Sequence, residues 1–271
     1  MEGQGRPRRL GFGVVARAAA EAATLAGLGS ALERLGYHEL WANDGRTRSG
    51  LATLAAACDT DALDLGLGVA PLSERSPAQI AAEVEQLGLP LDRLIVGVGT
   101  GDGSSLEAVR EGVTGVRELL PGVRVAVAAL GPRMCRLGGE VADVVLLNWV
   151  FPERIAWSRR RIEEGAAAAD RPAPQVTGYV RVAIGPDSAD RLLAEADRYR
   201  RRPRPYVRLF EEQAATGHER VPGVAAMDPS AASALLAPYR SALDSCVIRA
   251  LPASDSVEEL VAIAAAAAGR G

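Results

Sequence analysis

VRVAVAALGPRMCRLGGEVADVVLL, residues 123–147, contains the pattern that decides the fold. Residues 123–128 and 144–147 are short runs rich in valine and leucine, which predict two buried strands. Residues 132–140 lie between them and predict a helix that begins at Pro132, because proline suits the first helical position. A strand, a helix and a second strand in this order predict a parallel pair joined by a right-handed crossover.

The same unit repeats on both sides of this stretch. Strands are expected at residues 10–15, 38–43, 63–70, 94–98, 123–128, 144–147, 176–184 and 245–250. Helices are expected at residues 18–35, 51–58, 77–87, 105–120, 132–140, 152–168, 187–200, 207–215, 230–243 and 256–267. Eight alternating strand–helix units predict an α/β fold, a (β/α)₈ TIM barrel that forms a single domain over residues 1–271.

The rival architecture is a doubly wound open sheet. Such a sheet usually carries a GxGxxG sequence at its first strand–helix turn. Here the first turn reads VVARAA, residues 14–19, without that glycine pattern. We therefore favour the closed barrel.

Composition excludes several classes of function. The formal net charge is −3, which argues against a nucleic-acid partner, because nucleic-acid-binding proteins usually present a basic surface. The chain contains no lysine, so Schiff-base chemistry on a lysine amine is excluded.

Cysteine and histidine are scarce and scattered. Cys58, Cys135 and Cys246 form no CxxC pattern, and His38 and His218 form no HxxxH pattern, so we expect no disulfide framework and no metal site. The first residues lack the apolar segment of a signal peptide, and no stretch is apolar enough to span a bilayer. A cytoplasmic location without a membrane partner is the default expectation.

Two strand ends carry features typical of ligand binding, and barrel enzymes place their active site at the carboxyl ends of the strands. The loop at residues 97–103 is rich in glycine, which either brings backbone N–H groups close to a ligand or makes a plain turn. The segment LGPRM, residues 130–134, starts a helix, and its free N–H groups with Arg133 predict an anion site. An ordinary helix start is the alternative.

A basic run, RYRRRPRPYVR at residues 198–208, has two interpretations. A solvated helix end and loop is the one we favour. The other is a clamp for an anionic tail of a ligand, formed by Arg200, Arg201 and Arg202.

Several segments together resemble a known family. They are GYHELWAND at 36–44, LGVAP at 67–71, RSPA at 75–78, VGVGTG at 96–101, AALGPRMCRLGGEVADVVLLNW at 128–149, VIRALP at 247–252 and VEEL at 257–260. Their order and spacing resemble the luciferase-like monooxygenases, especially the branch that uses the deazaflavin coenzyme F420. The resemblance spans nearly the whole chain.

The resemblance implies an oxidoreductase that moves a hydride between F420 and a small organic substrate, with FMN as the alternative cofactor. It implies a cis peptide bond between Gly68 and Val69 beneath the cofactor ring. The cofactor phosphate is expected at Leu130, Gly131, Pro132, Arg133 and Met134, which agrees with the anion site read from the residues alone.

The remaining expected site residues lie around the same strand ends. Gly99, Thr100 and Gly101 are expected to contact the cofactor, and Trp41 and Trp149 to wall the site. Asp102 follows the glycine loop, where some members of the family carry a catalytic acid. Asp44 is the second candidate proton carrier, unless Arg46 or Arg48 holds it in a structural pair.

Two departures from the family pattern keep alternatives open. Gly45 stands where many deazaflavin enzymes carry histidine, and only residues 106–122 connect the fourth and fifth strands, where relatives insert a longer segment. An FMN-dependent monooxygenase, a non-catalytic cofactor-binding barrel and an unrelated phosphate-binding barrel enzyme are the alternatives. The sequence leaves the substrate and the oligomeric state open, with a homodimer as one option.

Overall fold

The strands form one parallel sheet that closes on itself. A computed structural model describes residues 8–45, 47–101, 105–201, 204–218, 221–254 and 256–270. Its strands are β1 (Arg9–Val14), β2 (Glu39–Ala42), β3 (Asp64–Pro71), β4 (Leu94–Gly99), β5 (Arg124–Ala128), β6 (Val144–Asn148), β7 (Gln175–Ile184), β8 (Val224–Ala226) and β9 (Ser245–Ala250).

Eight of these strands make the barrel. Strands β1 to β6 pair in sequence, β6 pairs with β7, β7 with β9, and β9 with β1, all in parallel. The predicted (β/α)₈ barrel is therefore confirmed. The short strand β8 pairs with β7 outside the closed ring. Sequence analysis did not predict it, because two of its three residues are alanine, a residue depleted in strands.

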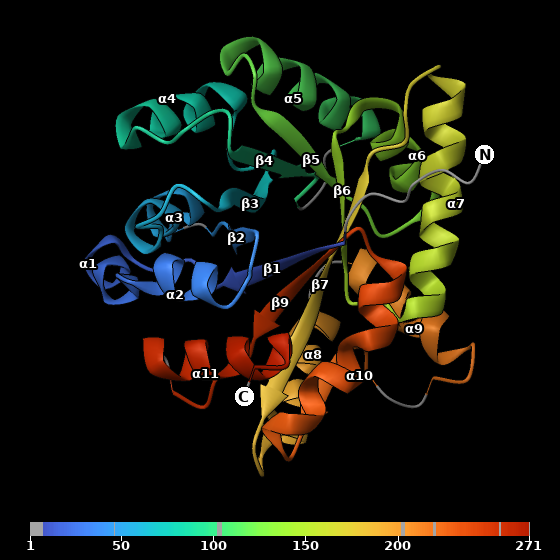
Figure 1. The fold of residues 1–271 in the computed structure, drawn as a ribbon. Helices are drawn as coiled ribbons and strands as arrows, with labels where there is room; N and C mark the ends of the chain where they lie inside the picture. The colour runs from blue at the N-terminus through green and yellow to red at the C-terminus, as the bar shows by residue number, and fades with distance from the viewer. Residues whose placement is uncertain are drawn as a thin grey trace, which may run out of the picture.

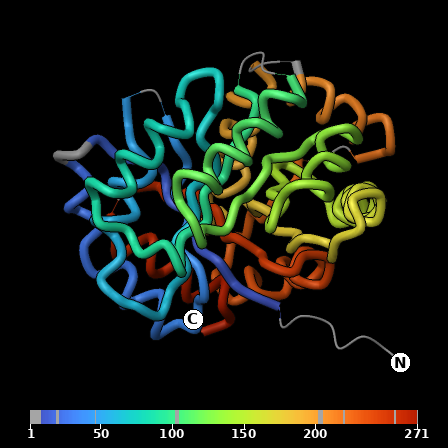
Figure 2. The backbone as a smooth tube through the Cα atoms, turned by 90° about the horizontal axis from the view of Figure 1, so that it is seen from above, coloured from blue at the N-terminus to red at the C-terminus, as the bar shows by residue number. Residues whose placement is uncertain are grey.

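Helices surround the barrel (Figure 1). They are α1 (Ala19–Ala22), the 3₁₀ turn η1 (Ala23–Leu25), α2 (Leu28–Arg34), α3 (Gly50–Ala57), α4 (Pro77–Leu87), α5 (Leu106–Leu119), α6 (Pro132–Val141), α7 (Pro152–Ala168), α8 (Ser188–Arg200), α9 (Arg204–Ala214), α10 (Pro229–Ala242) and α11 (Val257–Ala268). Figure 2 shows the tube from above, with the C-terminus at the lower edge. None of the helices in the described part of the chain is both long and apolar enough to cross a bilayer.

Local sequence explains where most helices begin. Ser76 caps α4 in a capping box with Gln79, and Ser105 caps α5 through the N–H of Ala108. One prediction was wrong: residues 18–35 are not a single helix. Gly27 has φ +82°, and this left-handed residue separates η1 from α2.

Strand residues alternate between two apolar layers, as buried parallel strands do. The outer layer packs against the helices. The inner layer fills the barrel with the buried cluster Trp41, Ile95, Ala126, Val144, Leu146, Tyr179 and Val247. The Trp41 indole occupies the space over Gly66, where a Cβ would lie 2.1 Å from the ring. The barrel is therefore a filled core, with room for ligands only at its ends.

Charged residues inside the barrel are balanced at the amino ends of the strands. Arg9 pairs with Glu39 at 2.9 Å and with Asp64 at 2.6 Å, and Arg124 pairs with Asp64 at 2.8 Å. Glu39 also accepts hydrogen bonds from Trp41 Nε1 and Ser245 Oγ, both at 2.8 Å. Two guanidinium groups thus face two carboxylates, and the formal charges of these four side chains sum to zero at this end of the barrel.

Candidate functional site

The structure brings the predicted cofactor residues to the carboxyl ends of three adjacent strands. Gly68 and Val69 lie in β3, Gly99 ends β4, and Leu130 follows β5. These strands pair in the order β3, β4, β5. A Cβ built on Gly99 would lie 3.0 Å from Val69 Cγ2 and 3.5 Å from Ala128 Cβ, so the three strand ends touch.

The peptide bond between Gly68 and Val69 is cis, as the family resemblance implied. Tyr179 Oη donates to the Gly68 carbonyl at 3.4 Å from across the barrel. Val69 is partly exposed and packs on the inner cluster. Its side chain therefore borders the space above the filled core.

The glycine loop after β4 is described only in part. Gly99 is buried, Thr100 is partly exposed, and Gly101 is exposed with φ +62°. A Cβ on Gly101 would lie 2.1 Å from Ser73 Oγ, which shows how closely this loop approaches the end of β3. Asp102, the first candidate acid, lies outside the described residues.

The segment Leu130–Met134 has the form of an anion cradle. Gly131 is the N-cap of α6, Pro132 is its first residue, and no side chain caps this helix. The N–H groups at such a start point outward, and the helix dipole favours a negative charge there. A Cβ built on Gly131 would meet no atom of the described residues within 4 Å, so among them the space directly over the cap is open. Arg133 is exposed beside it.

Asp44, the second candidate acid, is held in an ion pair. Its carboxylate accepts from Arg75 Nη1 at 2.6 Å and from the Gly50 N–H at 3.0 Å, and its side chain is 1% exposed. Arg75 also pairs with Glu83 at 2.5 Å. Asp44 is thus held in a structural ion pair, as the sequence suggested, but its partner is Arg75. Arg48 contacts Gly45 through its backbone. Arg46 lies outside the described residues.

A cavity of about 370 Å³ lies beside this ion pair, lined by Asp44, Gly45, Pro71, Glu74 and Arg75. It lies where the ends of β2 and β3 meet, next to the glycine loop. Because the Asp44 side chain is 1% exposed and that of Arg75 is 17% exposed, the guanidinium is the more accessible charged group of this wall.

The two tryptophans lie deeper than their expected role as walls suggests. Trp41 is fully buried in the inner cluster and is tied to Glu39. Trp149 follows β6 with φ +56°, is 1% exposed, and packs on Tyr199 and Phe210. Both indoles therefore form part of the floor and side of the mouth.

Two residues that sequence analysis did not single out also reach this mouth. Arg181 of β7 and Arg249 of β9 are register partners on neighbouring strands. Arg181 donates to Asn148 Oδ1 and stacks on Trp149, with its guanidinium carbon 4.1 Å from the ring centroid. The sequence feature that could have identified them is an arginine at an inward position of an otherwise apolar strand, in YVRVAI and SCVIRA.

Where it is described, the basic run is largely exposed or paired with acidic residues that flank it. Arg200 pairs with Asp197 at 2.8 Å, Arg208 pairs with Glu212 at 3.2 Å, and Arg201 is exposed. Arg202 lies outside the described residues.

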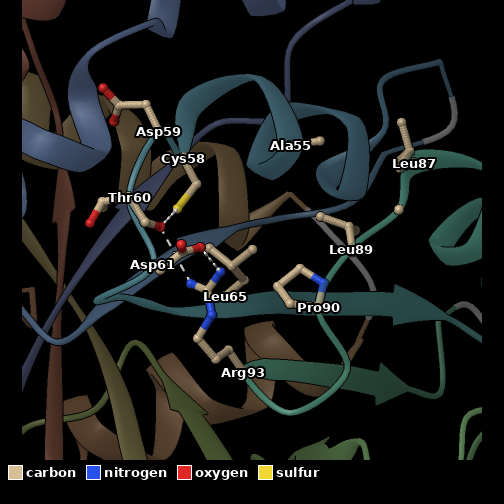
Figure 3. Close-up of a pocket in the computed structure, with 11 residues that line it drawn as sticks. Ala55, Cys58, Asp59, Thr60, Asp61, Leu65, Leu87, Leu89, Pro90 and Arg93 are labelled. Carbon is tan, nitrogen blue, oxygen red and sulfur yellow. Dashed lines mark hydrogen bonds and ion pairs between the residues drawn. The ribbon is translucent and has the colours of Figure 1, made fainter.

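A second cavity of about 230 Å³ lies at the opposite rim, between the end of α3 and the start of β4 (Figure 3). There Arg93 donates to the Leu63 carbonyl at 2.7 Å and to Asp61 at 2.8 Å, and Cys58 Sγ donates to the Thr60 carbonyl at 3.2 Å. These polar groups tie the loops to one another. Barrel residues at this end serve stability, so we place the candidate site at the other end.

Potential metal ligands do not gather in the described part of the chain: no three His, Cys, Asp or Glu side chains there are arranged to hold an ion. The candidate site therefore consists of the uncapped helix start at Gly131, the glycine loop and the inward-facing Arg181 and Arg249 around one barrel mouth.

Comparison with known proteins matches the chain to one family. The profile described as luciferase-like monooxygenase matches residues 10–114 and 110–238. A 5,10-methylenetetrahydromethanopterin reductase of Methanolobus tindarius is 26% identical over 196 residues, which are 58% of this chain and 60% of that relative.

Solved structures share the fold over nearly the whole chain. An F420-dependent secondary alcohol dehydrogenase in complex with an F420–acetone adduct has a TM-score of 0.72 at 16% identity, covering 98% of this chain and 100% of that chain. The coenzyme F420-dependent tetrahydromethanopterin reductase of Methanopyrus kandleri has a TM-score of 0.70 at 19% identity, covering 96% and 97%. The oxygenating constituent of 3,6-diketocamphane monooxygenase from Pseudomonas putida, in complex with FMN, has a TM-score of 0.59 at 14% identity, covering 98% of each.

Proposed function

Because the chain belongs to the luciferase-like monooxygenase family, we propose that it is an oxidoreductase that transfers a hydride between bound coenzyme F420 and a small organic substrate. The curated relative and the two solved structures with the higher TM-scores act with F420 or on a tetrahydromethanopterin substrate by name. FMN-dependent monooxygenation is the second candidate, since an FMN-binding member shares the barrel.

The observation that carries the proposal is the open space over Gly131. Any larger residue at this N-cap would put a side chain where a phosphate must approach the first N–H groups of α6, and here a Cβ would meet nothing within 4 Å. The helix also lacks a side-chain cap that would compete for those N–H groups. The residues present therefore fit a cofactor that carries a phosphate, as both F420 and FMN do.

Different segments of the mouth would bind different parts of the cofactor. Leu130 to Met134 hold the phosphate, and Val69, Gly99 and Thr100 border the ring from the ends of β3 and β4. The filled core below, closed by Trp41, excludes water from that side. When bound, F420 supplies a carbon that gives or takes a hydride, and the protein positions it against the substrate.

Hydride transfer to an imine, a carbonyl or an activated alkene also requires a proton. Asp102 and Asp44 are the candidate carriers. Asp44 is neutralised by Arg75 and is nearly fully buried, and this arrangement favours a role in holding the mouth together. Asp102 is therefore the preferred carrier in this proposal.

The first experiment compares the two cofactors. Purified protein is titrated with F420 and with FMN, and binding is followed by cofactor fluorescence. We expect a dissociation constant for F420 at least about tenfold below that for FMN, a difference of about 1.4 kcal/mol. Tighter binding of FMN would favour the monooxygenase.

The second experiment tests turnover. Protein loaded with reduced F420 is mixed with ketones, imines and activated alkenes, and oxidation of the cofactor is followed in a single turnover. Asp102→Asn should slow the transfer by about 10²–10⁴-fold without changing cofactor affinity. Binding without turnover of any substrate class would favour a non-catalytic cofactor-binding barrel.

A further inference from the structure

Two arginine side chains enter the barrel from adjacent strands at the same level. Arg181 lies two residues beyond Tyr179 in β7, and Arg249 lies two residues beyond Val247 in β9. Tyr179 and Val247 belong to the inner cluster, so strand alternation directs both guanidinium groups inward, above that cluster.

Gly13 of β1 confirms the direction of Arg249. A Cβ on Gly13 would lie 3.3 Å from Arg249 Cδ and 3.2 Å from Tyr179 Cε1. Because Gly13 has no side chain, the aliphatic part of the Arg249 side chain fits beside it inside the barrel. Arg249 Nη1 makes only long contacts, with the carbonyl oxygens of Gly13 at 3.4 Å and Ala250 at 3.3 Å.

Neither guanidinium has a carboxylate partner among the residues that the structure describes. The side chains that most affect the pKa of Arg181 are the tyrosines Tyr199, Tyr206 and Tyr179, and those that most affect the pKa of Arg249 are Arg181, Tyr199, Tyr179 and Arg198. The opposite end of the barrel balances two arginines with Glu39 and Asp64. The mouth thus carries an excess of positive charge that the interior elsewhere avoids.

Arg249 remains charged at neutral pH. Burial lowers the pKa of Arg249 to about 10 and also lowers the pKa of Arg181. Arg181 is 2% exposed and Trp149 is 1% exposed. Neither Arg181 Nε nor Trp149 Nε1 has a hydrogen-bond acceptor among the described residues. Arg249 is partly exposed. Buried donors without acceptors beside a reachable guanidinium are what an anion-binding pocket presents before it is filled.

We infer that Arg181 and Arg249 form a binding site for an oxyanion, a carboxylate or phosphate, carried by the substrate. The substrate part of this inference rests on the proposed function, whereas oxyanion binding itself does not. The cofactor cradle follows β5, and β6 and β7 lie between it and β9 in the ring. The mouth therefore has separate positions for the phosphate of the cofactor and for an acidic group of the substrate.

Asn148 and Trp149 support this site from β6. Asn148 Oδ1 accepts from Arg181 Nη1, and Asn148 Nδ2 donates to Tyr206 Oη at 3.0 Å. The guanidinium carbon of Arg181 lies 4.1 Å from the centroid of the Trp149 ring, within the range of a cation–π contact. These contacts fix the orientation of Arg181, and the guanidinium of Arg249 is left as the group that an incoming anion meets first.

The test uses inorganic phosphate as the probe, followed by ³¹P NMR line broadening at low ionic strength. Wild type is compared with Arg249→Gln and Arg249→Lys, and with Arg160→Gln as control, since Arg160 is exposed on the outer helix α7. Arg249→Gln should raise the phosphate dissociation constant about tenfold or more. Arg249→Lys should lose less, because it keeps the charge without the planar fork. Arg160→Gln should match wild type.

A second arm separates substrate from cofactor. Phosphate titration is repeated with F420 or FMN bound, so that the cofactor occupies the cradle at residues 130–134. Phosphate should still bind, and Arg249→Gln should still raise its dissociation constant about tenfold or more. Displacement of the probe by succinate assigns a carboxylate substrate, and displacement by methyl phosphate alone assigns a phosphate ester.

Two results would overturn the inference. One is equal phosphate binding by cofactor-loaded wild type and both cofactor-loaded Arg249 variants. The other is loss of phosphate binding in the cofactor-loaded protein, because the arginines would then hold the cofactor itself. Failure of both F420 and FMN to bind would refute the proposed function instead. The phosphate titration of the free protein and its Arg249 variants would still test oxyanion binding.

Discussion

Arg75 Nη1 lies 2.6 Å from Asp44 Oδ2, and this ion pair joins the end of β2 to the residues just before α4. The same guanidinium reaches Glu83 in α4 at 2.5 Å. Glu83 in turn accepts from Ser49, which caps α3. The polar side chains of Asp44, Arg75, Glu83 and Ser49 thus connect the ends of β2 and β3 with α3 and α4 at the rim of the mouth. Asp44 therefore has a structural role.

Removal of Arg75 is expected to destabilise the fold. Arg75→Gln leaves the Asp44 carboxylate, with a side chain 1% exposed, without its partner, and such a loss costs about 3–5 kcal/mol. The double variant Asp44→Asn/Arg75→Gln should cost less than the sum of the single variants. Urea denaturation measures each free energy of unfolding. Arg208→Gln, which breaks an exposed pair with Glu212, is the control and should cost less than about 1 kcal/mol. An equal cost for Arg75→Gln and Arg208→Gln would contradict a structural role for the pair.

Gly131→Val is expected to weaken cofactor binding and leave the fold intact. The valine side chain would enter the open space over the start of α6 and block an approaching phosphate. Loss of hydrogen bonds to a charged group corresponds to about 1.5–3 kcal/mol, or about 10–100-fold in the dissociation constant. Cofactor fluorescence gives the affinity and circular dichroism checks the fold. Gly131→Ala should fall between wild type and Gly131→Val, and unchanged affinity in both variants would move the phosphate site elsewhere.

Local features of the sequence were sufficient for the barrel and for the cradle. Helices α4 and α7 begin and end where predicted, because Ser76, Pro77 and Pro152 are local signals. The cradle at Gly131 was also predictable, since glycine, proline and the helix start are consecutive residues. A glycine inside an alanine-rich run is a weaker signal, and the break at Gly27 was missed for that reason.

Partners that are far apart in the sequence could not be predicted from it. Arg181 and Arg249 become neighbours only through the register of β7 and β9, and Asp44 finds Arg75 rather than the nearby Arg48. Gly99, Leu130 and Gly131, which the sequence placed after their strands, lie at the strand ends in the structure, and their contact with a cofactor stays a prediction. The inward residues within the strands were overlooked, because their burial depends on closure of the whole ring.

Gly66→Ala is expected to be among the more damaging small substitutions. A Cβ at this position would lie 2.1 Å from the Trp41 ring, and the indole is fully buried and hydrogen-bonded to Glu39, so it cannot move aside freely. Overpacking of this kind costs about 1–3 kcal/mol or more. Thermal and urea unfolding measure the loss. Gly131→Ala is the matched control, since it adds the same methyl group in open space, and equal stability of the two variants would refute the packing inside the barrel.

Neutralisation of the basic run is expected to have little effect on the cofactor. Arg200 is already paired with Asp197 at 2.8 Å, and exposed ion pairs contribute little. The triple variant Arg200→Gln/Arg201→Gln/Arg202→Gln should bind F420 of long and short polyglutamate tail with less than about a threefold change, which is under 0.7 kcal/mol. A loss that grows with tail length and shrinks with added salt would instead assign the run as a clamp for the tail.

The cysteine thiols should differ sharply in reactivity. Burial raises the pKa of Cys135 to about 11 and that of Cys246 to about 12, and the two side chains are 0% and 1% exposed. Only the thiolate reacts with a disulfide reagent, so a raised pKa lowers reactivity at pH 8 and lets it rise with pH. Cys58 is partly exposed. Native protein with Ellman's reagent at pH 8 should therefore release one equivalent quickly, and protein in guanidinium chloride should release all three. Cys58→Ser should abolish the fast equivalent. A second fast equivalent from native protein would show that the packing around Cys135 or Cys246 is open.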